Sequence, residues 1–169
     1  MPLDASNLPD PSSSPAASPP DAIDRPKIVL LVGLPGCGKT TWLDGKPGVL
    51  SSDALRELLA DDPGNQTIHA LVFRVLRNLL KARLELRRPV TYVDATNLTP
   101  KERAPYLKLA ARHDADVEAV FFDVPMRECI RRNRLRPTRI VPSEVIEKMA
   151  RRLIPPVEGE GFSRVTVIR

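Results

Sequence analysis

One eight-residue stretch, residues 33–40 (Gly-Leu-Pro-Gly-Cys-Gly-Lys-Thr), has the residue types and spacing needed to hold a phosphate chain. It follows the apolar run 28–32 and fills every fixed position of the pattern G-x-x-x-x-G-K-S/T. Glycines at these positions let main-chain N–H groups approach phosphate oxygens. Lys39 is predicted to reach the β- and γ-phosphates, and the Thr40 hydroxyl to ligate Mg²⁺. The alternative is a Gly/Pro-rich turn that happens to contain Lys-Thr.

The stretch therefore predicts a site for a nucleoside triphosphate with Mg²⁺. The helix that it opens is expected to favour the anion through its N-terminal amides. The predicted cofactor-binding residues of this stretch are Gly33, Pro35, Gly36, Cys37, Gly38, Lys39, Thr40 and Thr41.

Two aspartates, Asp53 and Asp94, follow short apolar segments downstream of this loop. Ligands of an open α/β sheet bind at the carboxyl ends of its strands, so Asp53 is expected near the γ-phosphate. Asp94 is predicted to be a Walker-B-type carboxylate that holds Mg²⁺ or its waters. Arg56 lies three residues after Asp53, on the same helical face. Alternatively, Ser52 or Asp53 is only the N-cap of a helix.

An arginine-rich segment forms the second informative region. Guanidinium groups suit phosphate oxygens and the charge of a phosphoryl-transfer transition state. We predict a lid over residues 127–153, made of a helix, an arginine-bearing loop and a second helix from about Ser143. Spacing places Arg132 and Arg136 on one face, with Arg139 in the loop. The alternative is an ordinary exposed basic helix. Residues 127–139 contain no lysine, and their arginines are Arg127, Arg131, Arg132, Arg134, Arg136 and Arg139.

Secondary-structure patterns place these residues in an α/β fold. Apolar segments near 28, 49, 90, 117 and 164 predict five parallel strands, with helices on both faces of the sheet. Residues 68–80 carry an apolar stripe at helical spacing. Thr99, Pro100 and Glu102 predict a capping box at the start of another helix. No role is assigned to His69.

Composition sets the outer bounds. Residues 1–25, rich in proline and serine, are expected to be a disordered tail, and residues 26–169 a single domain. The tail carries a formal charge of −3, so the remainder carries +8 within the whole-chain +5, which suits a polyanionic partner. No apolar run approaches the ~20 residues needed to span a bilayer. The only cysteines, Cys37 and Cys129, show no metal-binding spacing and are expected to be reduced thiols of a cytoplasmic protein.

Several motifs together carry a family resemblance over residues 27–169. Besides the phosphate loop they are Ser-Asp-x-x-Arg at 52–56, Gln66, Asp-Ala-Thr-Asn at 94–97 and the arginine lid. In order and spacing they resemble the kinase module of bacterial polynucleotide kinase–phosphatases, and less closely the phage end-healing kinase. The resemblance implies a P-loop kinase that moves the γ-phosphate of ATP to the 5′-hydroxyl end of single-stranded RNA or DNA.

The resemblance also implies roles for single residues. Asp53 would be the general base toward the 5′-hydroxyl, and Arg56 would hold the neighbouring phosphate. Gln66 would help place the acceptor strand. Arg132 and Arg136 would clamp the donor phosphates, with Arg139 beside them. The predicted catalytic residues are Asp53, Lys39, Arg56, Arg132 and Arg136.

Two other functions remain open from the sequence. One is a P-loop kinase of a small hydroxylated metabolite, drug or sugar nucleotide, which Arg56 and the basic charge disfavour. The other is a nucleotide-dependent switch with no acceptor. The absence of a guanine-reading Asn-Lys-x-Asp or Thr-Lys-x-Asp motif disfavours a GTPase switch, and an aspartate after the second strand is more useful to a kinase.

Overall fold

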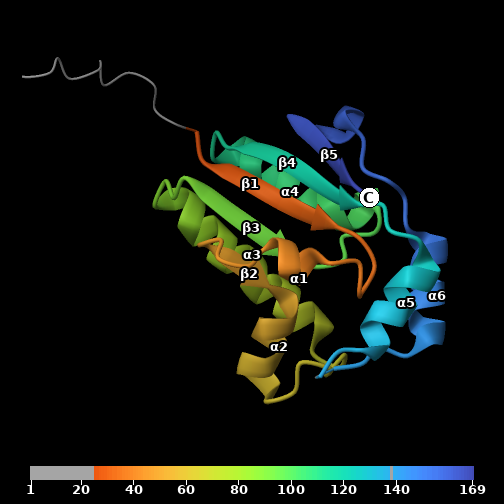
Figure 1. Cartoon of the computed structure of the whole chain (residues 1–169). Helices are drawn as coiled ribbons and strands as arrows, with labels where there is room; N and C mark the ends of the chain where they lie inside the picture. The colour runs from red at the N-terminus through yellow and green to blue at the C-terminus, as the bar shows by residue number, and fades with distance from the viewer. Residues whose placement is uncertain (1–24, 138) are drawn as a thin grey trace, which may run out of the picture.

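The computed structural model describes residues 25–137 and 139–169. The predicted tail therefore lies outside the described residues, apart from Arg25. The described chain forms five strands and six α-helices, with a short 3₁₀ segment η1 (Glu158–Glu160) before the last strand (Figure 1). The predicted α/β class is confirmed.

The five strands form one wholly parallel sheet with the order β2-β3-β1-β4-β5. Their bounds are β1 Lys27–Val32, β2 Val49–Ser51, β3 Val90–Asp94, β4 Asp116–Phe122 and β5 Arg164–Ile168. Central β1 pairs with β3 on one side and β4 on the other. Ser51 pairs with Asp94 at the carboxyl ends of β2 and β3, which sets the segments after both strands at one edge.

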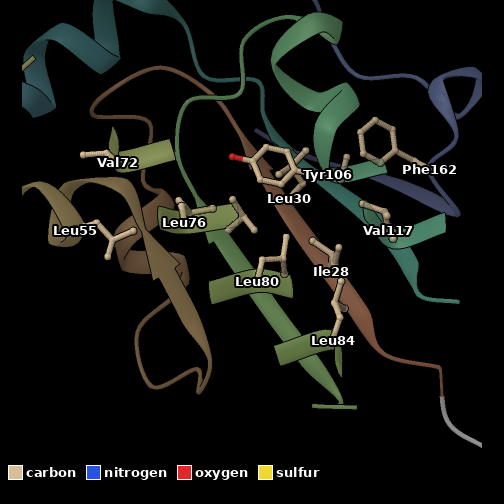
Figure 2. Close-up of a cluster of buried hydrophobic side chains, with 13 residues drawn as sticks. Ile28, Leu30, Leu55, Val72, Leu76, Leu80, Leu84, Tyr106, Val117 and Phe162 are labelled. Atoms are coloured by element: carbon tan, nitrogen blue, oxygen red, sulfur yellow. The ribbon is translucent and has the colours of Figure 1, made fainter. Parts of the chain in front are cut away.

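Alternate residues of β1 belong to two separate hydrophobic cores, one on each face of the sheet. Ile28 and Leu30 belong to the core that packs against α2 (Ser52–Ala60), α3 (His69–Glu85) and α4 (Pro100–Arg112). Figure 2 shows this cluster, with Leu76 and Leu80 of α3 beside β1. Val29 and Leu31 belong to the other core, which packs against the phosphate loop, α5 (Met126–Arg134) and α6 (Ser143–Arg152). A strand covered on both faces explains why β1 reads as a continuous apolar run.

Helix ends refine two sequence predictions. The cap of α2 is Ser51, whose Oγ accepts from the Ala54 N–H at 3.4 Å, so the prediction of Ser52 or Asp53 as the cap is wrong by one or two residues. Thr99 caps α4 as predicted, accepting from the Glu102 N–H. Glu102, however, accepts from the N–H of Leu98 rather than from that of the cap residue. Both ends satisfy amides that a helix leaves without internal partners.

The stripe on α3 is confirmed, but the buried face differs from the prediction in one respect. Val72, Leu76 and Leu80 are fully buried, and the face continues to Leu84. Leu79 belongs to the predicted stripe, yet 41% of it is exposed. The reason is geometric, since a 3.6-residue period rotates a wide stripe out of contact at its margin.

The predicted lid consists of two well-packed helices and one connecting loop. Cys129 of α5 and Ile146 of α6 are completely buried in the second core. In Figure 1 the two helices lie side by side, and the loop between them extends toward the segment that follows α2. The helices therefore fix the ends of the loop, and the loop carries Arg136 and Arg139 to the site.

Candidate active site

Two glycines of the phosphate loop, Gly33 and Gly36, lie very close to neighbouring atoms. Gly36 has φ +85°, and a Cβ there would lie 2.3 Å from the carbonyl oxygen of Cys129. A Cβ at Gly33 would lie 2.8 Å from the Cys37 sulfur. Only glycine satisfies both the left-handed backbone and the contact with α5 at position 36. The sequence pattern therefore reports a packing requirement as well as access to phosphates.

Lys39 lies at the floor of this loop and is only 8% exposed. Its Nζ donates to the carbonyl oxygens of Gly33 at 2.9 Å and Leu34 at 2.8 Å. These contacts hold a cation in the curve of the loop. The main-chain N–H groups of the glycine-rich loop, the Lys39 ammonium and the Thr40 hydroxyl together fit the phosphates of a nucleotide.

The helix after the loop has a single turn. α1 spans only Lys39–Trp42, because the loop segment with Gly45, Pro47 and Gly48 follows. A single turn has a small dipole, so local N–H groups and Lys39 supply most of the attraction for an anion. Trp42 closes this end by packing edge-on against Tyr92 and Phe122.

Two cavities meet above the carboxyl ends of the strands. The larger, about 1230 Å³, lies along the phosphate loop, α1 and α5. The smaller, about 490 Å³, lies between α2, α3, the Asp94 segment and the lid. Four predicted site residues line both: Thr40, Asp53, Arg136 and Arg139. A phosphate donor in one cavity and a hydroxyl acceptor in the other would therefore meet at these residues.

Asp53 sits at this junction and is held by two arginines. Its Oδ1 accepts from Arg56 Nη1 at 2.9 Å and forms an ion pair with Arg139 Nη1. Arg56 is 4% exposed, and its Nη1 also donates to the Ser52 carbonyl oxygen. Burial lowers the pKa of Arg56, although the Asp53 carboxylate opposes that effect. Both contacts converge on Oδ1, so neither arginine bonds to Oδ2.

Asp94 and Thr40 are the residues whose oxygens could hold a metal ion. Both line the smaller cavity, and burial raises the pKa of Asp94, while nearby Lys39 lowers it. Over residues 25–137 and 139–169, no group of three or more His, Cys, Asp or Glu side chains could hold a metal by itself. One carboxylate and one hydroxyl fit Mg²⁺, which takes few protein ligands and completes its shell with water and phosphate oxygens.

The lid arginines lie in different settings. Arg132, on α5, lies over the phosphate loop, where its Nη1 would be 3.9 Å from a Cβ at Gly38. Its Nε donates to Glu128 Oε1 at 2.5 Å. Arg136 lies beyond the end of α5 at Arg134, so its predicted place on a shared helical face with Arg132 is wrong. Both arginines nevertheless line the larger cavity, because the chain turns there.

Most of the other predicted residues also surround the two cavities. Gly36, Cys37, Gly38 and Thr41 line the larger one, and Pro35 and Gln66 the smaller one. Gly33, the first residue of the loop, lies against Cys37 and Phe122.

Three further residues shape the site that sequence reasoning did not find. His69 lines the smaller cavity beside Arg56, and Glu128 holds Arg132. Asn133 is buried and pins the lid loop through two hydrogen bonds with the main chain of Val141, at 2.7 and 3.2 Å. His69 and Asn133 bond residues that are 13 and 8 positions away, so no local pattern indicates these contacts. Only Glu128 gave a sequence signal, because Arg131 and Arg132 follow it at the i+3 and i+4 positions of a helix.

Within the described part of the chain, no helix is long and apolar enough to cross a membrane. Cys37 and Cys129 are both free and buried.

This arrangement defines a nucleotide-binding P-loop domain of the kinase type, built for phosphoryl transfer. The family model of an AAA domain, AAA_33, matches residues 28–156, and the chain belongs to this family. The match begins at β1 and continues past the end of α6, so it includes the phosphate loop, Asp53, Asp94 and the lid.

Solved structures share the fold at low sequence identity. A chain of the Pnkp1/Rnl/Hen1 complex is 23% identical with a TM-score of 0.56, covering 70% of this chain and 42% of that one. This chain thus spans less than half the length of that protein. A sugar kinase from Janibacter sp. HTCC2649 is 18% identical with a TM-score of 0.58, covering 85% and 84%. A gluconokinase from Sinorhizobium meliloti 1021 is 18% identical with a TM-score of 0.54, covering 85% and 82%. These likenesses concern the fold.

Proposed function

We propose that this protein is an ATP-dependent 5′-hydroxyl polynucleotide kinase acting on single-stranded RNA or DNA ends, as in nucleic-acid repair. The observation that carries the proposal is Asp53 at the junction of the two cavities, bonded to Arg56 and Arg139. A carboxylate beside arginines matches an acceptor that carries a phosphate next to its reacting hydroxyl.

The proposed mechanism uses positioning and charge neutralisation. Arg132, which lines the larger cavity, and Lys39, which lines the smaller one, would hold the donor phosphates where the two cavities meet, and Thr40 and Asp94 would hold Mg²⁺. Bound Mg²⁺ would neutralise charge on the phosphate oxygens. Asp53 Oδ2 would take the proton of the acceptor hydroxyl while that oxygen bonds to the γ-phosphorus and the bond to ADP breaks.

A second candidate acceptor is a small hydroxylated metabolite, drug or sugar nucleotide. The smaller cavity favours it, because its volume suits a drug-sized molecule and the lid supplies apolar residues to its wall. Those residues are Ile140, Val141, Val145 and Met149.

A labelling experiment tests the proposal. Wild-type protein receives γ-labelled ATP and Mg²⁺ with 5′-hydroxyl RNA, 5′-hydroxyl DNA or a panel of small alcohols that includes sugars. We expect label on oligonucleotide 5′ ends, and none on matched 5′-phosphorylated oligonucleotides. Label found only on a small alcohol would replace this proposal with the second candidate.

A further inference from the structure

His69 stands at the acceptor cavity next to the buried arginine. It is the first residue of α3, is exposed and lines the smaller cavity. Its Nδ1 lies 3.4 Å from Arg56 Nη2, and Arg56 in turn bonds Asp53. The ring is also steadied by Phe73 one turn later, with ring centroids 4.7 Å apart. A single polar chain therefore runs from the carboxylate at the reaction point to an imidazole in the cavity.

The Arg56 contact decides the protonation of this imidazole. A guanidinium has only donors, so the hydrogen bond requires a lone pair on His69 Nδ1. The ring proton is then on Nε2, and the imidazole is neutral. Burial and the charge of Arg56 both lower the pKa of His69, as does Arg152, while Glu102 opposes them. The arrangement favours a neutral N–H donor beside an existing cation, which avoids placing two positive charges in contact.

We infer that His69 is an acceptor-binding residue whose Nε2–H donates to an oxygen of the acceptor's sugar–phosphate chain. This inference rests on the proposed function. Arg56 orients the ring and is itself almost fully buried, with Nη1 committed to Ser52 and Asp53. His69 thus adds a donor to the acceptor cavity at the end of the chain that begins at Asp53.

Two substitutions separate a contact with the acceptor from support of Arg56. Glutamine at position 69 can place an amide donor near the Nε2 position, whereas asparagine places an acceptor near the Nδ1 position and has no group near Nε2. We expect His69→Ala and His69→Asn to raise the acceptor KM about tenfold, the effect of one lost hydrogen bond. His69→Gln should stay within about threefold of wild type by the same scale.

The measurement is steady-state transfer to a 5′-hydroxyl oligonucleotide, with the KM of ATP, kcat and Tm determined for each variant. The KM of ATP should not change, because His69 faces the acceptor cavity. The matched control is His113→Gln, at the C-terminal end of α4. An unchanged acceptor KM in His69→Ala overturns the inference. So does rescue by asparagine rather than glutamine, which would mean that His69 only positions Arg56.

Failure of the proposed function gives a different result. In that case the wild-type protein labels no oligonucleotide at all. The same four variants are then compared on whichever alcohol the wild type labels. An unchanged KM for that alcohol overturns the inference, and a raised KM that glutamine restores supports a donor contact to that acceptor instead.

Discussion

At the scale of single residues, the decisive group is the carboxylate of Asp53. We expect Asp53→Asn to lower kcat by a factor of roughly 10² to 10⁴, the usual effect of losing a general base. Binding of ATP should stay nearly intact, because the carboxylate acts on the acceptor proton. The checks are single-turnover transfer and calorimetric titration with ATP. Wild-type turnover in this variant would show that Asp53 is not the base.

Glu128 gives a pH dependence that belongs to one side chain. Hydrogen bonds from Arg131 and Arg132 lower its pKa from 4.5 to about 2. As the pH falls, Glu128 is protonated in the unfolded chain before it is protonated in the folded chain. The contribution of its carboxylate to folding stability is therefore complete above about pH 4.5 and disappears as the pH falls toward 2.

Glu128→Gln has no carboxylate at this position, so we expect it to lose less stability than the wild type as the pH falls from about 4.5 to 2. Thermal melts of both proteins between pH 2 and 7 test it, since subtraction removes the titration of all other carboxylates. The Tm difference should shrink as the pH falls. A difference that is constant with pH would mean that the Arg131 and Arg132 contacts do not stabilise the charged form of Glu128.

At the scale of elements, the phosphate loop is locked to α5. Gly36→Ala should cost roughly 2–5 kcal/mol of unfolding free energy, because it adds left-handed strain and a clash with the Cys129 carbonyl. Gly45→Ala is the matched control, since Gly45 has φ +71° but no heavy atom within 4 Å of an added Cβ. It should cost roughly 1–2 kcal/mol from strain alone. Urea unfolding measures both, and equal costs would contradict the packing argument.

A buried ion pair ties α4 to the segment that follows the lid. Arg103 is completely buried, bonds both carboxylate oxygens of Glu160 at 2.6 and 2.8 Å, and donates to the carbonyls of Asn97 and Ile154. Arg103→Met leaves these acceptors buried without a donor and should cost roughly 3–5 kcal/mol.

The exposed pair between Arg152 and Glu102 supplies the control. Arg152→Met should cost at most about 1 kcal/mol. Chemical denaturation measures the unfolding free energy lost in each of the two variants. If the two losses are similar, the buried pair is not the anchor of this region.

The elements were more predictable than the contacts between them. Glycine spacing, an aspartate after an apolar segment and the Thr99 cap are local signals. In the structure the loop follows β1, Asp53 lies two residues after the end of β2, Asp94 ends β3 and Thr99 caps α4. The pairing of His69 with Arg56 spans 13 residues and depends on how α3 begins, which no periodicity records. Arg136 was misplaced because α5 ends at Arg134, two residues before it.

At the scale of the whole molecule, charge and cavity shape point to different acceptors. Residues 26–169 carry a formal charge of +8, which favours a polyanion. The smaller cavity, with apolar lid residues in its wall, also suits a compact molecule. Both features are compatible if only the terminal nucleotide enters the cavity and the following phosphates remain outside, in the field of the basic domain.

The salt dependence of the acceptor KM shows whether the protein binds phosphates beyond the terminal nucleotide. A polynucleotide releases condensed counterions when it binds, so log KM for the acceptor should rise linearly with log salt concentration, with a slope of about 0.7 per neutralised phosphate of a single strand. A 5′-hydroxyl dinucleotide should show a shallower slope than a 12-nucleotide strand, and the KM of ATP measured in parallel serves as the control. Equal slopes for both lengths would mean that only the end of the strand is bound, and that the basic surface of the domain has no part in acceptor recognition.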